Sequence, residues 1–230
     1  MGSETAKQYL MLGGMTILER TLMAFQAASL VDTIYLILPH EDVEQISQRI
    51  PSSHNLVKLK RILAGGERRQ DSVKKGVDLI DSDYDLVTVH DGVRPFVSPA
   101  TINAAIEKAV QYNAVTLGVP VTDTIKKVDG QRFICETVNR DQLWLTQTPQ
   151  VFAVPLLKKA YESAYAGQYY GTDDAALVER IGQKVLMIMG AQDNIKITTP
   201  LDLLWGEFIL KVRQKENMVS LSGDMCRRTS

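Results

Sequence analysis

The stretch YDLVTVHDGVRPF (residues 84–96), which runs into SPATINAAIEKAVQY (residues 98–112), decides the fold class. The first part is a short apolar run that ends in polar residues, a pattern typical of a buried strand. The second part places Ser98 before Pro99 and then repeats apolar residues at helical spacing, so it predicts a helix capped by the Ser98 hydroxyl. A buried strand, a polar loop and an amphipathic helix together indicate one step of an α/β fold.

The same alternation recurs along the chain. Four more apolar runs predict strands, and they are TIYLILP (residues 33–39), LKRILAGG (residues 59–66), AVTLGVPV (residues 114–121) and KVLMIMG (residues 184–190). Segments with helical spacing are HEDVEQISQRI (residues 40–50), RRQDSVKKGVDLI (residues 68–80), residues 155–166, a short segment from Thr172, and residues 200–214. The pattern predicts a doubly wound α/β domain with a mostly parallel, Rossmann-like sheet, formed by residues 1–121 and 149–216 and followed by a polar tail at 217–230.

The rhythm changes between residues 122 and 148. The segment DTIKKVDGQRFICETV (residues 123–138) holds two short alternating runs on either side of Asp129 and Gly130, which is a strong signal for a β-hairpin. A hairpin inserted in an α/β domain usually forms a projecting arm. We therefore expect residues 122–148 to act as a lid or as a contact between subunits.

Composition excludes several classes of function. The chain has 230 residues and a net charge of −1, so it has no general basic field for nucleic acid or anionic membranes, and any anionic ligand must be held by local cations. It shows no signal peptide and no apolar run near 18 residues, so no membrane span is predicted. Cys135 and Cys226 have no metal-ligand spacing and are expected to be free thiols of a reducing compartment.

Three loops follow predicted strands, at the edge where α/β sheets bind ligands. GGERRQDS (residues 65–72) has two glycines that expose backbone N–H groups, HDGVRP (residues 90–95) brings Asp91 and Arg94, and DNIKITTP (residues 193–200) brings Lys196. Asp91 suits a divalent cation and Arg94 suits a phosphate. A plain turn, a bracing Asp–Arg ion pair and a solvated lysine are the structural alternatives.

Other catalytic patterns are missing from the sequence. It contains no Walker P-loop, no G-x-G-x-x-G fingerprint and no G-x-S-x-G elbow. Glycine-rich turns, strand-end carboxylates and scattered cations suit phosphate chemistry, in which the protein positions charges and a metal ion without a covalent intermediate.

In order, seven segments resemble the sugar-phosphate cytidylyltransferases, and most closely the branch that acts on 2-C-methyl-D-erythritol 4-phosphate. They are KQYLMLGGMTIL (residues 7–18), GGERRQDSV (65–73), VHDGVRPFV (89–97), VPVTDTIKKV (119–128), TVNRDQLWLTQTPQVF (137–152), TDDAALVE (172–179) and DNIKIT (193–198). The resemblance implies a Rossmann-like nucleotidyltransferase that transfers a cytidylyl group from CTP to methylerythritol phosphate and releases pyrophosphate. It also implies Mg²⁺ and a homodimer joined through the arm.

The resemblance implies these site residues. Lys7 and Lys196 would stabilise charge at the α-phosphorus of CTP, and Asp91 would hold Mg²⁺. The cytidine pocket would consist of Gly66, Glu67, Ser72 and Gly92, together with Asp91. The polyol phosphate would contact Arg94, Thr124, Thr148, Thr172, Lys196 and, across the dimer, Arg140.

The start of the chain departs from the family pattern. Lys7 matches the lysine that follows the family's glycine-rich loop, and Met1-Gly2 matches the tail of that loop. The first strand, the loop glycines and a loop arginine would then lie upstream. The resemblance therefore predicts a chain truncated at its N-terminus and impaired in activity.

Alternative functions stay open on the sequence alone. The nearest is a ribitol 5-phosphate cytidylyltransferase, which shares most of these motifs. A non-catalytic nucleotide-binding relic would explain the missing loop, and an NAD-dependent dehydrogenase fits the fold without its fingerprint. The expected compartment is the cytoplasm, or the plastid stroma if a leader has been lost.

Overall fold

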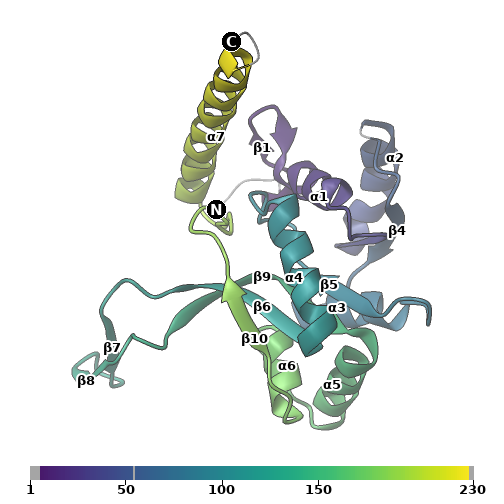
Figure 1. Ribbon diagram of the computed structural model, residues 1–230. Helices are drawn as coiled ribbons and strands as arrows, with labels where there is room; N and C mark the ends of the chain where they lie inside the picture. The colour runs from purple at the N-terminus through teal and green to yellow at the C-terminus, as the bar shows by residue number, and fades with distance from the viewer. Residues whose placement is uncertain (1–5, 54, 228–230) are drawn as a thin grey trace.

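The computed structural model of the protein describes residues 6–53 and 55–227 (Figure 1). Met1-Gly2, predicted to be the tail of a glycine-rich loop, lies outside these residues. None of the described helices is both long enough and apolar enough to cross a bilayer.

A four-stranded sheet forms the centre of the molecule. Its order is β10 (Leu186–Met189), β6 (Ala114–Pro120), β9 (Trp144–Ala153) and β5 (Leu86–Val89). β10 pairs with β6 in parallel, whereas β9 is antiparallel to both of its neighbours. The sequence predicted a mostly parallel sheet, and the observed pairing is mixed because β9 lies between two strands that run against it.

Sequence patterns did not predict β9 as a strand. Its run is interrupted by Pro149, and proline usually argues against a central strand because it cannot donate a ladder hydrogen bond. Consecutive residues of β6 pair with Gln147 and Gln150, so Thr148 and Pro149 form a bulge between them. A bulge leaves its extra residues out of the ladder, and proline is tolerated there.

β3 (Ile34–Leu38) and β4 (Leu59–Ala64) form a separate parallel pair. Among the described residues, β3 has no strand neighbour on its second edge, and β5 has none on its own. The single sheet predicted from the sequence is therefore divided into two pieces.

Helices cover both faces of the central sheet. Successive side chains of β9 point to opposite faces, so neighbouring residues of this strand contact different helices. Val151 packs with Ala105 and Ala109 on one face, and Phe152 packs with Leu157 and Tyr161 on the other. The first face is covered by α4 (Pro99–Tyr112), and the second by α5 (Val154–Ala166) and α6 (Asp174–Arg180).

The remaining elements complete the chain. They are the 3-10 helices η1 (Lys7–Tyr9) and η2 (His40–Asp42), the short strands β1 (Met11–Leu12) and β2 (Met15–Thr16), and the helices α1 (Ile17–Ala27), α2 (Val43–Ser53), α3 (Arg69–Asp78) and α7 (Pro200–Arg227). α7 is longer than the helix predicted over residues 200–214 and includes most of the predicted polar tail.

The start of α4 follows the prediction made from its sequence. The Ser98 hydroxyl oxygen accepts a hydrogen bond from the backbone N–H of Thr101 at 3.0 Å, and Pro99 occupies the first turn. Asn113 ends the helix in the left-handed region with a φ of 62°. Both helix ends are thus set by local side-chain and backbone preferences.

The arm is an antiparallel hairpin of β7 (Ile125–Val128) and β8 (Ile134–Val138), as predicted, and it extends away from the sheet (Figure 1). The Asp129 carboxylate stabilises its turn by accepting backbone N–H bonds from Gln131 and Phe133, both at 2.9 Å. The arm leaves large apolar side chains exposed, including Phe133.

We predict that Phe152→Ala lowers the free energy of unfolding by about 3–5 kcal/mol, because it removes a fully buried ring from the face under α5 and α6. The measurement is two-state denaturant unfolding. Val57→Ala, at a position 63% exposed and outside the arm, is the control and should change stability by less than about 0.5 kcal/mol. Equal losses in the two variants would contradict this description of the core.

Candidate active site

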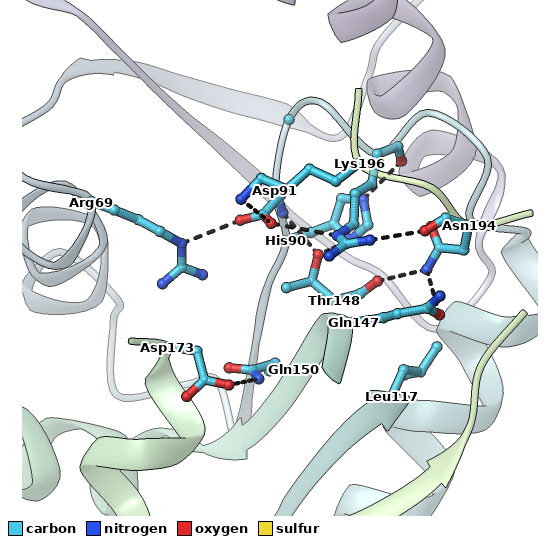
Figure 2. A network of polar contacts seen from close by, with 12 residues as sticks. Arg69, His90, Asp91, Leu117, Gln147, Thr148, Gln150, Asp173, Asn194 and Lys196 are labelled. Atoms are coloured by element: carbon cyan, nitrogen blue, oxygen red, sulfur yellow. Dashed lines mark hydrogen bonds and ion pairs between the residues drawn. The ribbon is translucent and has the colours of Figure 1, made fainter. Parts of the chain in front are cut away.

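The loop after β5 places one carboxylate among three cations (Figure 2). Asp91 Oδ1 lies 3.2 Å from Arg69 Nε, and Asp91 Oδ2 lies 3.0 Å from Lys196 Nζ and 3.5 Å from Arg94 Nε. Burial alone would raise the pKa of Asp91, but the charges of Arg69, Lys196 and Arg94 outweigh it and lower the pKa to about 2. The cluster keeps an excess of positive charge that suits an anionic ligand.

Arg69, at the start of α3, links this cluster to α6. Its Nη1 lies 2.8 Å from Asp174 Oδ2, and the Asp174 side chain is buried. Burial would lower the pKa of Arg69, but the charges of Asp174 and Asp91 raise it, so the guanidinium stays ionised. Sequence reasoning did not assign Arg69 a role, because only the fold brings its two carboxylate partners together.

His90 is held as a neutral ring between two loops. Its Nε2 lies 3.1 Å from the Arg94 carbonyl oxygen, which can only accept, so Nε2 carries the proton. Nδ1 therefore accepts from the Thr148 hydroxyl at 3.1 Å, and the same hydroxyl oxygen accepts from the backbone N–H of Asp91 at 3.1 Å. Burial lowers the pKa of His90 to about 4.

The loop that carries Lys196 is tied to the bulge of β9. Asn194 Nδ2 donates to the Thr148 carbonyl oxygen at 3.0 Å (Figure 2). Gln147 Nε2 donates to the Ala191 carbonyl oxygen at 2.8 Å. The backbone carbonyl oxygen of Asn194 in turn accepts a hydrogen bond from Arg94 Nη1 at 2.9 Å. The bulge thus positions the cationic loops on both sides of Asp91.

A second polar network orders the loop before α6. The amide of Gln150, fully buried in β9, donates to Asp173 Oδ2 at 2.7 Å and accepts from the backbone N–H of Asp174 at 3.2 Å (Figure 2). Asp173 caps α6 by accepting from the Ala176 N–H at 3.0 Å. Thr172, a predicted site residue, directly precedes this cap.

Gln70 holds the same loop from the other side. It belongs to α3, its side chain is buried, and it accepts from the Gly171 N–H at 2.9 Å while donating to the Tyr169 carbonyl oxygen at 3.0 Å. Gln70 therefore connects the glycine-rich loop before α3 to the loop that carries Thr172.

The glycine-rich loop itself is compact. The Gly66 N–H donates to the Ser72 hydroxyl oxygen at 3.0 Å, and the Ser72 hydroxyl donates to the Arg68 carbonyl oxygen at 3.1 Å. A Cβ on Gly66 would overlap the Asp71 side chain, so the turn requires glycine. Glu67 is exposed at the tip of the loop.

The predicted site residues fall into four groups. Asp91, Arg94, Thr148 and Lys196 are in one contact network, and Gly66, Glu67, Ser72, Gly92 and Thr172 lie on the loops next to it. Lys7 is exposed in η1, beside Gln8, which lines one cavity with Asp91 and Lys196. Thr124 and Arg140 lie on the arm, and in the described part of the chain they make no contact with the Asp91 cluster.

We predict that stability falls by up to about 3 kcal/mol between pH 6.5 and pH 4, because the folded protein holds His90 neutral while the unfolded chain takes up the proton. The sign follows from the lowered pKa: the contribution is complete above pH 6.5 and is lost as the pH falls towards 4. Asp91 adds its own loss only at lower pH, between 3.8 and about 2.

His90→Gln should flatten the pH profile of stability between pH 6.5 and pH 4, measured by denaturant unfolding at each pH. His40→Gln, at an exposed position in η2, is the matched control and should follow the unsubstituted protein. An unchanged slope in His90→Gln would refute the assignment.

Comparisons with known proteins agree with the resemblance noted in the sequence. Residues 1–212 match the family model described as 2-C-methyl-D-erythritol 4-phosphate cytidylyltransferase. Two relatives have the same description. The protein from Syntrophus aciditrophicus is 42% identical over 211 residues, which cover 92% of this chain and 90% of that relative. The protein from Clostridioides difficile is 42% identical over 221 residues, which cover 96% of this chain and 92% of that relative.

Solved structures give the same result. The 4-diphosphocytidyl-2C-methyl-D-erythritol synthase of Anaerococcus prevotii superposes with a TM-score of 0.83 at 32% identity, covering 91% of this chain and 92% of that one. The 2-C-methyl-D-erythritol 4-phosphate cytidylyltransferase of Thermus thermophilus superposes with a TM-score of 0.74 at 33% identity, covering 89% and 94%. The chain therefore belongs to the 2-C-methyl-D-erythritol 4-phosphate cytidylyltransferase family, and it is a cytidylyltransferase of isoprenoid precursor synthesis.

Proposed function

We propose that the Asp91 cluster carries out the cytidylyl transfer. A phosphate oxygen of methylerythritol phosphate bonds to the α-phosphorus of CTP, and the bond from that phosphorus to the bridging oxygen breaks, so that pyrophosphate leaves. The observation that supports this role is the convergence of Arg69, Arg94 and Lys196 on one carboxylate. One positive charge remains after Asp91 and Asp174 are both counted, and it favours a triphosphate.

Lys196 is suited to stabilise the charge that develops during transfer. Its side chain is 42% exposed although its Nζ lies 3.0 Å from Asp91, so the ammonium group can reach a ligand while the carboxylate holds it near the site. Cations placed where charge develops lower the barrier more than they favour ground-state binding. We assign Lys7 the same role, because its neighbour Gln8 lines the cavity that Asp91 and Lys196 share.

Mg²⁺ fits Asp91 as a single protein carboxylate. The described residues contain no group of three carboxylate, histidine or cysteine side chains that could hold a metal by themselves. Mg²⁺ does not require such a group, because it usually takes one or two carboxylates and completes its shell with phosphate oxygens and water. When bound, the ion would neutralise part of the triphosphate charge.

The loops around the cluster supply the two substrate pockets in this proposal. Gly66, Glu67, Ser72 and Gly92 would line the cytidine pocket at the N-terminal end of α3, where the partial positive charge of the helix suits base and ribose oxygens. Arg94, Thr148 and Thr172 would contact methylerythritol phosphate from three different elements.

Thr124 and Arg140 would act across a homodimer. The arm of residues 122–148 extends beyond the α/β domain of residues 1–121 and 149–216, and its side chains Phe133 and Ile134 are 68% and 63% exposed. Exposed apolar side chains at the end of an arm favour burial against a second subunit. Because the relatives quoted above are bacterial, we place the reaction in the cytoplasm.

We predict that Lys196→Met lowers kcat by roughly 100- to 1,000-fold with a much smaller change in the KM for CTP, because the lost charge acts mainly in the transition state. The assay is pyrophosphate release from CTP with Mg²⁺ and methylerythritol phosphate, with ribitol 5-phosphate as the comparison substrate. Lys159→Met, at an exposed position on α5, is the matched control.

Nearly normal turnover in Lys196→Met would refute the role of Lys196. A protein that binds CTP but releases no pyrophosphate, even without substitution, would instead favour a nucleotide-binding relic.

Gln70→Ala should raise the KM for methylerythritol phosphate on the order of tenfold, because two hydrogen bonds that hold the Thr172 loop are lost. The KM for CTP should change less, since the glycine-rich loop keeps its Gly66–Ser72 bond. Gln183→Ala, at an exposed position, is the control. An equal rise in both KM values would mean that Gln70 supports the fold as a whole and does not position that loop.

A further inference from the structure

A guanidinium on α7 bridges the two loops that carry the cations and the carboxylate of the site. Arg213 Nη2 donates to the Phe96 carbonyl oxygen at 2.8 Å, in the loop after β5 that also holds Asp91. Asp193 Oδ2, in the loop between β10 and α7, accepts from Arg213 Nε at 3.0 Å and from Arg213 Nη2 at 2.6 Å. We call these three contacts the Arg213 clamp. The clamp joins two segments that are about a hundred residues apart, through a residue of a third.

α7 gives the clamp a firm base. Leu210 of this helix packs against the buried cluster that contains Phe96 and Ile197. Leu210 lies three residues before Arg213, so the two side chains share one side of the helix. The Phe96 ring is 1% exposed, and its centre lies 5.4 Å from the guanidinium carbon of Arg213. Apolar contacts therefore fix the helix, and the guanidinium projects from a fixed place.

The loops are tied to each other at two other points. The Ile197 N–H donates to the Val93 carbonyl oxygen at 2.9 Å, and Arg94 Nη1 donates to the backbone carbonyl oxygen of Asn194 at 2.9 Å. Arg94 is also assigned to the phosphate of the substrate, so its bond to the loop is subject to change when a ligand binds. The clamp uses no group assigned to a ligand, and it can hold the loops in the same way with and without substrate.

Packing alone does not fix this part of the loop. A cavity of about 60 Å³ lies next to the clamp, lined by Phe96, Asn194 and Arg213 among others. The Asn194 side chain is 1% exposed, and its Oδ1 accepts no hydrogen bond from the described residues. A loop beside a cavity lacks contacts on one side and has room to shift. The directed hydrogen bonds of Arg213 are therefore needed to hold it.

We propose that Arg213 is a positioning residue for the cytidylyl transfer, which holds the Lys196 loop against the Asp91 loop and so keeps Lys196 in place. Its effect on turnover rests on the role proposed above for Lys196. The Lys196 ammonium lies 3.0 Å from Asp91, and it must also lie where charge develops on the ligand. A displacement of about 1 Å caused by a change outside the reacting groups is enough to cost on the order of 100-fold in rate.

The first test is Arg213→Gln, which removes the charge and the forked donor. We expect kcat to fall about tenfold, with the KM for CTP changed by less than about threefold, because a displaced Lys196 acts mainly on the transition state. Hydrogen exchange of the Ile197 N–H should become faster, since the contact between the loops opens more often. Lys211→Gln, an equal charge change at an exposed position of α7, is the matched control and should alter neither quantity.

Two further variants separate geometry from charge. Arg213→Lys keeps the positive charge but cannot donate to both partners as the planar guanidinium does, so kcat should recover only in part. Asp193→Asn removes the other half of the clamp. It should lower kcat as Arg213→Gln does, and the double variant should be no slower than either single one, because both changes break the same contact.

The last test places Arg213→Gln in the Lys196→Met protein, where it should cause no further loss of kcat. A full further loss there would overturn the proposal, because Arg213 would then act independently of Lys196. Full recovery in Arg213→Lys, unchanged exchange at Ile197 in Arg213→Gln, or an equal loss in Lys211→Gln would overturn it as well. Normal turnover in Arg213→Gln beside a slow Lys196→Met would overturn the clamp alone, whereas normal turnover in Lys196→Met would overturn both proposals.

Discussion

The buried carboxylate of Asp91 is the constraint on which the site depends. A carboxylate removed from water must be paired, and Asp91 takes its partners from three places: Arg69 from α3, Arg94 from its own loop and Lys196 from the loop after β10. These partners fix where α3 and the two loops can lie. The same charges that keep Asp91 ionised leave an excess of positive charge, so one arrangement both stabilises the fold locally and prepares it for a triphosphate.

β9 connects the Asp91 cluster to the core of the domain. It pairs with β5, which ends at Asp91, and with β6, and its alternate side chains pack under helices on both faces. At its bulge, Thr148 contacts His90 and the Asp91 backbone, while Gln150 orders the loop before α6. A single strand therefore supplies core residues at one end and polar contacts of the site at the bulge.

The strand pair β3–β4 is separated from the central sheet by a cavity that reaches the Asp91 cluster. The cavity between β3 and β5 is lined by Arg69, Asp91 and Lys196, and Arg69 also pairs with Asp91 and Asp174. Strand pairing and charge placement are coupled here because both rely on the carboxyl ends of parallel strands meeting at one edge.

Features that depend on neighbouring residues could be predicted from the sequence: the alternation of strands and helices, the Ser98 cap of α4, the turn of the arm at Asp129, and the loops that carry Asp91, Arg94 and Lys196. Caps, turns and apolar periodicity act within a few residues, so they can be read locally. The other features depend on contacts between residues that are far apart in the sequence. β9 crosses a proline that its bulge accommodates, Arg69 finds Asp91 and Asp174 only in the fold, and Arg94 reaches Asn194 across 100 residues of chain. The two-piece sheet was also beyond the sequence, because pairing between strands depends on which edges meet in space.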